Sequence, residues 1–207
     1  MKVVESTRLV SDVQRLREGL RGLPEPVAEP VLIVVSGLPG TGKSFVSRRL
    51  AERVPLLILE SDALRKILFS LPSHSAGESS QLFQKIHLLI EKLLKEGISL
   101  ILDATNLSER FRERLYSIAD RTNARLVMVL VEAPPEVVRQ RLEGRAGDPE
   151  DNSDADWSVY CQMISSVERI SRNHYIVDTS RYIGPVIDKV VREIRQFPLR
   201  REPGQQN

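Results

Sequence analysis

The chain has 207 residues, of which 41% are apolar and 28% are charged, and its formal net charge is +2. This length and composition allow one core of ordinary size and exclude a fibrous or intrinsically disordered chain. No apolar stretch approaches the roughly 18 uninterrupted residues of a membrane span, and the N-terminus lacks the profile of a signal peptide, so we expect a cytoplasmic protein. The single cysteine, Cys161, excludes an internal disulfide and is expected to be at least half-buried.

Residues 1–30 form a leader that differs from the rest of the chain. Leu9, Val13, Leu16 and Leu20 recur at helical spacing, and a proline-rich connector at 24–30 follows them. This pattern predicts one amphipathic helix that packs on the domain or on a partner, such as a second copy of the chain. We therefore expect three parts, which are the leader 1–30, a domain at 31–198 and a disordered tail at 199–207.

From residue 31 onward, apolar strands alternate with amphipathic helices. Continuous runs of Val, Ile and Leu between helices are typical of a parallel sheet covered on both faces. The predicted strands are 31–36, 55–60, 98–103, 125–132 and 174–178. The predicted helices are 43–53, 62–70, 78–96, 108–121, 135–144, 156–171 and 183–197. Ligands of such sheets bind at the carboxyl ends of the strands, so the residues just after each strand are the candidates for function.

A phosphate-binding loop of the pattern GxxxxGK[ST] follows the first predicted strand directly and leads into a helical pattern. Its glycines let successive backbone N–H groups converge on a triphosphate, and the following helix N-terminus adds partial positive charge. Within it, Lys43 is expected to contact the β- and γ-phosphates and Ser44 to bind Mg²⁺. The eight residues are Gly37, Leu38, Pro39, Gly40, Thr41, Gly42, Lys43 and Ser44.

Asp62 and Arg65 follow the second predicted strand and lie one helical turn apart. A carboxylate at this position could accept a proton from an attacking hydroxyl, and the arginine could hold an anionic group of the acceptor. The alternative is that Asp62 only caps the helix predicted at 62–70.

The third predicted strand ends in Asp103, and Thr105 and Asn106 come shortly after it. In a protein with a phosphate-binding loop, a strand-end aspartate orients Mg²⁺ or its water shell. Thr105 and Asn106 could then position the acceptor. The alternative is a turn that caps the next helix, for which Ser108 is already a suitable residue.

Arg141 and Arg145 lie four residues apart in the helix after the fourth strand, where a glycine-flanked break could begin a mobile lid. Such arginines can stabilise charge on the transferring phosphoryl group. The alternative is that they form ion pairs in solvent with neighbouring glutamates. An acidic segment at 148–156 follows.

Three further groups favour structural roles. The basic residues of the helix predicted at 108–121 indicate a solvated face, although two of them could flank an acceptor pocket. The three histidines show no metal-ligand spacing, and Trp157 with Tyr160 indicates core or lid packing. The basic residues are Arg110, Arg112 and Arg114.

Together, the loop GLPGTGKS, the Asp62–Arg65 pair, the DATN element at 103–106 and the two lid arginines resemble P-loop kinases, specifically the group of 5′-hydroxyl polynucleotide kinases and zeta toxin sugar-nucleotide kinases. The similarity covers about residues 31–195. It implies a three-layer α/β/α fold with a five-stranded parallel sheet and a helical lid. It also implies that Asp62 is the general base, Arg65 a contact to the acceptor, Arg145 a contact to the transferred phosphate, and Arg141 a residue near the nucleotide.

The resulting prediction is an ATP- and Mg²⁺-dependent phosphotransferase that acts on an acceptor hydroxyl. A polynucleotide 5′-hydroxyl ranks first as acceptor, and a small sugar, nucleoside or antibiotic is the alternative. Another class, a nucleotide-dependent switch or binding module, stays open, and Asp62 discriminates it because a switch needs no acceptor base.

Overall fold

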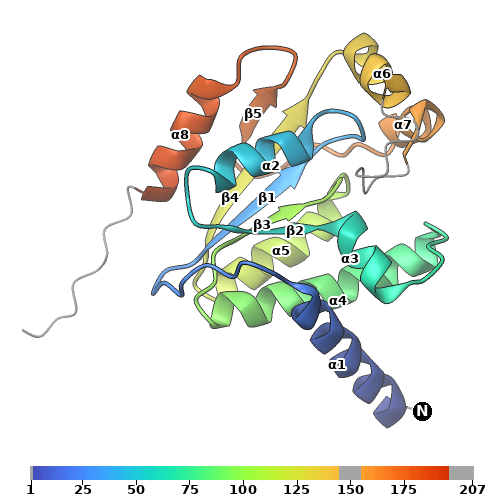
Figure 1. The fold of residues 1–207 in the computed structure, drawn as a ribbon, viewed down its shortest axis with the longest axis vertical. Helices are drawn as coiled ribbons and strands as arrows, with labels where there is room; N and C mark the ends of the chain where they lie inside the picture. The colour runs from blue at the N-terminus through green and yellow to red at the C-terminus, as the bar shows by residue number, and fades with distance from the viewer. Residues whose placement is uncertain (1, 145–154, 196–207) are drawn as a thin grey trace, which may run out of the picture.

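The computed structural model describes residues 2–144 and 155–195, which contain a five-stranded parallel sheet in the order β2-β3-β1-β4-β5 (Figure 1). The strands are β1 (Val31–Ser36), β2 (Leu57–Glu60), β3 (Leu100–Asp103), β4 (Arg125–Glu132) and β5 (Tyr175–Asp178). All four strand pairs are parallel, and the central strand β1 is buried along its whole length. The predicted α/β class and the five parallel strands are therefore confirmed.

Eight helices accompany these strands in the described part of the chain. They are α1 (Lys2–Gly19), α2 (Lys43–Ala51), α3 (Ser61–Leu68), α4 (Ala76–Lys95), α5 (Glu109–Arg121), α6 (Pro135–Gly144), α7 (Trp157–Ile164) and α8 (Gly184–Arg195). In Figure 1, α2 and α8 lie on one face of the sheet and α4 and α5 on the other. None of the helices described has the length and apolar character that crossing a membrane requires.

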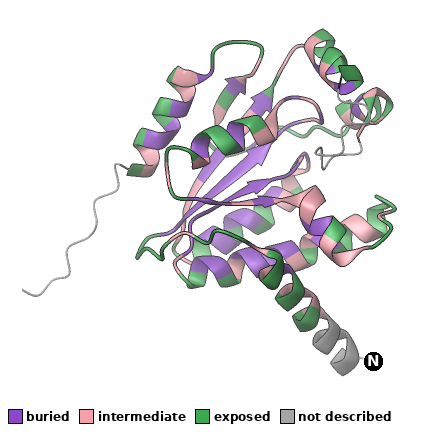
Figure 2. Cartoon of the chain, in the orientation of Figure 1, coloured by how far each residue is buried: buried purple, intermediate pink, exposed green. Residues whose placement is uncertain are grey.

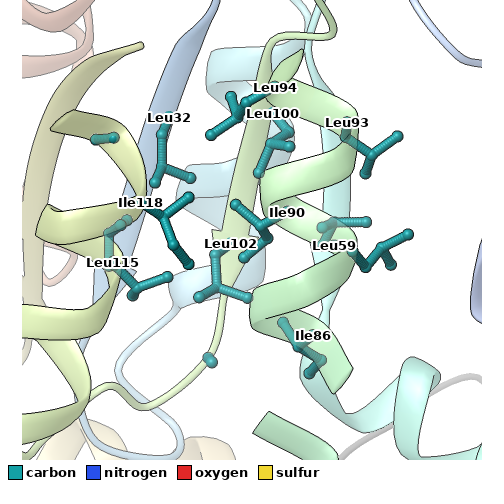
Figure 3. Packing of buried hydrophobic residues seen from close by; sticks show 14 of the residues in the cluster. Leu32, Leu59, Ile86, Ile90, Leu93, Leu94, Leu100, Leu102, Leu115 and Ile118 are labelled. Atoms are coloured by element: carbon teal, nitrogen blue, oxygen red, sulfur yellow. The ribbon is translucent and has the colours of Figure 1, made fainter. Parts of the chain in front are cut away.

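Alternate residues of the central strand supply the two faces of the core. Leu32 and Val34 belong to the cluster formed with α4 and α5, whereas Ile33 and Val35 belong to the cluster formed with α2 and α8. This follows from strand geometry, because successive side chains point to opposite faces of a sheet. Figure 3 shows the first cluster, in which Ile86 and Ile90 of α4 pack near the strand leucines. In Figure 2 the central strands are buried, whereas the helices carry buried, intermediate and exposed residues in turn.

The leader helix packs on the domain. Leu16 is fully buried in the cluster with α4, and Val13 and Leu20 pack against that cluster. Asp12 pairs with Lys85 of α4 at 3.0 Å, and Arg15 donates to the backbone carbonyl of Ile67 at the end of α3 at 2.9 Å. The apolar face of α1 is therefore covered by α3 and α4 of the same chain. Self-association through this helix stays a prediction.

Two expectations are corrected by the structure. The helix predicted over 156–171 ends at Ile164, because the N–H of Glu168 donates to the carbonyl oxygen of Leu107 and not to that of Ile164, the bond that would continue the helix. Cys161 is exposed on α7 and not half-buried. The tail at 199–207 and most of the acidic segment at 148–156 lie outside the described residues.

Candidate active site

The phosphate-binding loop connects β1 to α2, with Lys43 as the first residue of the helix. Gly42 precedes the helix with a φ of 93°, a left-handed conformation that residues with a Cβ avoid. Gly37 needs the absence of a side chain, because a Cβ there would lie 2.3 Å from the carbonyl oxygen of Val131 in β4. No side chain caps α2, so its first N–H groups and its dipole are left for an anion.

Side chains inside the loop hold its arch in shape. The hydroxyl of Thr41 donates to the carbonyl oxygen of Leu38 at 2.8 Å, and the ammonium of Lys43 donates to the same oxygen at 3.1 Å. Lys43 thus lies across the loop, where it could transfer its contacts to phosphate oxygens. The predicted role of this lysine is consistent with the geometry of the loop.

Asp103 ends β3 next to the start of the phosphate-binding loop, and only 5% of its surface is exposed. Burial raises the pKa of its carboxyl group, while the charge of Lys43 and the hydroxyls of Ser44 and Ser47 act in the opposite direction. One carboxylate oxygen of Asp103 is buried without a hydrogen-bond partner. A buried oxygen without a partner, next to the hydroxyl of Ser44, fits an oxygen-liganded Mg²⁺.

The loop after β3 is tied to the phosphate-binding loop by backbone contacts. The carbonyl oxygen of Thr105 accepts hydrogen bonds from the N–H of Gly37 at 3.0 Å and from the hydroxyl of Ser36 at 3.1 Å. The buried amide of Asn106 donates to the carbonyl oxygen of Val35 at 2.8 Å, and its backbone has a φ of 47°. Asn106 therefore uses its amide to hold the two loops together, while both residues also line the cleft described below.

Asp62 lies in the first turn of α3 and also lines the cleft. The residue at the N-cap of α3 is Glu60, and it makes no capping hydrogen bond through its side chain. Capping of this helix by Asp62, the alternative raised from the sequence, is therefore not what the structure contains. Its charge acts on the buried Asp103, whose pKa it raises slightly further, so the two carboxylates share one electrostatic environment.

Arg65, one turn further along α3, is buried and forms an ion pair with Glu78 of α4. Its guanidinium also donates to the hydroxyl of Ser79 at 3.3 Å. Hydrogen bonds from Ser73 and the ion pair with Arg65 lower the pKa of Glu78 to about 2, the largest cause being the backbone N–H of Ser73. Arg65 lines the cleft as predicted, but its charge is already matched by a carboxylate.

Arg141 of α6 connects the phosphate-binding loop to the segment after β5. It donates to the hydroxyl and the carbonyl oxygen of Thr179 at 2.7 and 2.9 Å, and more weakly to the carbonyl oxygens of Gly40 and Thr41. The solvent ion pair considered for this helix is instead made by Arg139 and Glu143. Arg145 lies outside the described residues.

A single cleft of about 1100 Å³ brings most of the predicted site residues together. It runs between the phosphate-binding loop, the starts of α3 and α4, the loop after β3 and helix α7. The predicted residues that line it are Pro39, Gly40, Gly42, Lys43, Ser44, Asp62, Arg65, Asp103, Thr105, Asn106 and Arg141. The remaining loop residues do not line the cleft but contribute to the conformation of the loop, through the hydrogen bond of Thr41 to Leu38 and the close approach of Gly37 to β4.

Several residues of the site were missed by the sequence analysis. Arg112 is fully buried, which corrects the prediction of a solvated face for this residue, whereas Arg110 and Arg114 are exposed as predicted. The position of Arg112 could have been found, because Leu115, Tyr116 and Ala119 follow it at helical spacing on the buried face of α5. Ser75 and Glu78 have the S-x-x-E spacing of a helix start, which could have placed Glu78 in the first turn of α4 but not beside Arg65. No sequence signal pointed to a site role for Phe83, Phe111 or Met163.

The predicted packing role of Trp157 and Tyr160 is confirmed. Their rings stack at 4.8 Å, and Tyr160 is buried with Val138 and Leu142, which joins α7 to α6.

Among the described residues, no group of three or more His, Cys, Asp or Glu side chains could hold a metal ion by itself.

The fold and this cleft define a P-loop nucleotide-binding protein with the kinase-type arrangement of five parallel strands. A family model described as an AAA domain (AAA_33) matches residues 32–170. The chain belongs to this family.

Solved structures with a similar fold share little sequence with the chain. The APS kinase of Mycobacterium tuberculosis, in complex with AMPPNP and APS, is 18% identical with a TM-score of 0.61, covering 83% of this chain and 100% of that one. A gluconokinase from Sinorhizobium meliloti is 20% identical with a TM-score of 0.58, covering 81% and 93%. Kti12 of Chaetomium thermophilum, in complex with ADP-AlF3, is 20% identical with a TM-score of 0.65, covering 79% and 97%.

Proposed function

We propose that the chain is an ATP- and Mg²⁺-dependent phosphotransferase that moves the γ-phosphoryl group of ATP to a hydroxyl of a small molecule. The observation that carries this proposal is the meeting of the phosphate-binding loop, Asp62 and Asp103 in one cleft. A nucleotide switch needs a phosphate-binding loop but has no need of an acceptor base. A cleft of about 1100 Å³ has room for a nucleotide and a small second substrate.

Each residue would have one task in this reaction. The N–H groups at the start of α2 and the ammonium of Lys43 would bind the phosphates. Ser44 and Asp103 would hold Mg²⁺, which neutralises charge on the phosphate oxygens when it is bound. Asp62 would accept the proton of the acceptor hydroxyl while that oxygen attacks the γ-phosphorus and ADP leaves. Arg141 would keep the loop in place, and Arg145 is proposed to contact the transferred phosphate.

The acceptor is proposed to be a small molecule in preference to a polynucleotide. The solved structures with this fold include enzymes named as APS kinase and gluconokinase, which supports this order. The spacing of Asp62 and Arg65 is the feature that favours the 5′-hydroxyl of a polynucleotide as second candidate. Against it, the charge of Arg65 is already taken up by Glu78.

The test is transfer of labelled γ-phosphate from ATP and Mg²⁺ to a panel of sugars, nucleosides and 5′-hydroxyl oligonucleotides. The proposal expects label on a small molecule, and it expects Lys43→Ala to abolish that transfer. Label on oligonucleotides alone would replace the acceptor class. Hydrolysis of ATP without transfer to any acceptor would favour the switch.

A further inference from the structure

We propose that the acceptor is an uncharged ring compound and that Glu78 excludes anionic acceptors by neutralising Arg65. This inference rests on the proposed phosphotransfer and names the substrate class of the same cleft. It concerns the part of the cleft formed by α3, α4 and α5, which we call the acceptor subsite and define by Asp62, Arg65, Ser79, Phe83 and Phe111.

The charges of the cleft are divided between its two parts. Lys43, Arg48 and Arg141 line the part next to the phosphate-binding loop, where a triphosphate needs cations. In the acceptor subsite, the guanidinium of Arg65 is compensated by Glu78, and Asp62 adds a negative charge. Among the five residues that define this subsite, Arg65 is the only cation, so an anionic acceptor would meet a compensated charge there and would be repelled by Asp62.

Glu78 is held so firmly that an incoming anion would not displace it easily. Besides the ion pair with Arg65, its carboxylate accepts hydrogen bonds from the N–H and hydroxyl of Ser73 at 2.7 and 2.8 Å and from the N–H of His74 at 3.3 Å. Its own N–H donates to the hydroxyl of Ser75, the N-cap of α4. The carboxylate is thus part of the start of a helix, and giving up Arg65 to a ligand would leave the buried pair broken.

The other wall of the acceptor subsite is apolar and aromatic. The rings of Phe83 and Phe111 lie 5.6 Å apart with an interplanar angle of 40°, and both line the cleft. Leu107 and Met163 extend this wall toward α7. Such a surface suits the face of a nucleobase or of a sugar ring, whose hydroxyl edge would then point to Asp62.

The test uses pairs of acceptors that differ only in charge, with the full-length protein, saturating ATP and Mg²⁺. The pairs are a nucleoside with its 3′-monophosphate and a hexose with its 1-phosphate, and the readout is kcat/KM for phosphate transfer. We expect the neutral member of the productive pair to be preferred by at least about tenfold, because a nearby like charge shifts a charged group's equilibrium by about one pKa unit or more and each unit is about tenfold.

The variant Glu78→Gln keeps the shape and hydrogen-bonding oxygen of the side chain but releases the charge of Arg65. We expect it to reduce the preference for the neutral acceptor by about tenfold or more, mainly through the KM of the anionic member. The double variant Arg65→Gln/Glu78→Gln restores charge balance and should restore the preference. The matched control Glu96→Gln removes the same charge at the other end of α4, where Glu96 pairs with Arg17, and should leave the preference unchanged.

The outcomes separate the two proposals. A wild-type preference for the anionic member, or a preference that Glu78→Gln leaves unchanged, overturns the role of Glu78 while the phosphotransferase stands. Absence of transfer to every member of both pairs counts against the phosphotransferase itself, and the acceptor inference falls with it.

Discussion

Arg112 donates a hydrogen bond of 2.6 Å to the carbonyl oxygen of Asn106, and through it α5 holds the loop that carries the strand-end residues of the site. The same guanidinium donates to the carbonyl oxygens of Glu168 and Arg169 at 2.8 and 2.9 Å, and it pairs with Glu109. One buried side chain thus joins the loop after β3 to the segment that follows α7. Since α7 lines the cleft, Arg112 links two of its walls.

Replacing Arg112 by alanine is expected to destabilise the protein by about 3–5 kcal/mol, because the change removes a fully buried guanidinium together with its hydrogen bonds to the carbonyl oxygens of Glu168 and Arg169. The measurement is the free energy of unfolding in urea. The control is Arg110→Ala on the exposed side of α5, which should change that free energy by no more than about 0.5 kcal/mol. Similar values for the two variants would contradict the role given to Arg112.

Gly37→Ala tests the close approach between the phosphate-binding loop and β4. A Cβ at this position would lie 2.3 Å from the carbonyl oxygen of Val131, so the loop has to shift. We expect affinity for ATP, measured by calorimetry, to fall by at least about tenfold, or ~1.4 kcal/mol. Gly77→Ala in the first turn of α4 is the matched control, because a Cβ there meets nothing within 4 Å. Equal affinities in the two variants would show that the loop tolerates the shift.

Arg141→Lys tests whether the contacts between α6 and the segment after β5 support nucleotide binding. Lysine keeps the charge but cannot reproduce the two hydrogen bonds to Thr179. We expect the KM for ATP to rise by about tenfold or more, since the loss of one charge-assisted hydrogen bond costs about 1.5–3 kcal/mol and about 1.4 kcal/mol is tenfold. Arg139→Lys on the same helix, where the arginine pairs with Glu143 in solvent, should leave this KM unchanged. A rise of the same size in both variants would assign the effect to α6 as a whole.

The buried His87 is expected to make the stability of the protein depend on pH. Burial, followed by the charge of Arg114, lowers its pKa to about 4, so the folded protein keeps this imidazole neutral while the unfolded chain binds a proton near pH 6.5. The contribution of the neutral His87 to the free energy of unfolding is therefore fully present above pH 6.5 and is lost as the pH falls toward 4. At pH 5 the loss should be about 1–2 kcal/mol relative to pH 7.

The measurement for His87 is the unfolding free energy of the wild type and of His87→Leu at pH 7 and pH 5. The variant should lack this part of the pH dependence, whatever its stability at pH 7. An identical change with pH in both proteins would mean that His87 does not carry it.

The fold could be predicted well where local pattern and tertiary structure agree. The strand over 31–36 and the strand over 125–132 have the predicted bounds, because their runs of Val, Ile and Leu are buried by helices on both faces. The phosphate-binding loop and the strand-end Asp103 could also be predicted from the sequence, since phosphate and metal chemistry dictate their residue types.

What could not be predicted depends on contacts between distant residues. The helix expected to reach residue 171 ends at Ile164, because the N–H of Glu168 donates to the carbonyl oxygen of Leu107, and Arg112 then binds the carbonyl groups of Glu168 and Arg169. Arg65 was expected to contact an anionic acceptor, but its partner Glu78 belongs to the next helix. The conformation of the loop between the two helices, which brings Glu78 to Arg65, could not be predicted from the sequence. In both cases a buried arginine contacts groups that only the tertiary fold brings close to it.

The most direct test of the account is the ratio of phosphate transfer to ATP hydrolysis in Asp62→Asn, measured with labelled ATP, Mg²⁺ and the best small-molecule acceptor of the wild type. Because Asp62 is proposed to accept the proton of the hydroxyl, transfer should fall by about 10²- to 10⁴-fold while ATP binds with nearly unchanged affinity and basal hydrolysis continues. Transfer that persists at the wild-type rate in this variant would contradict the assignment of Asp62 and, with it, the mechanism proposed for the cleft.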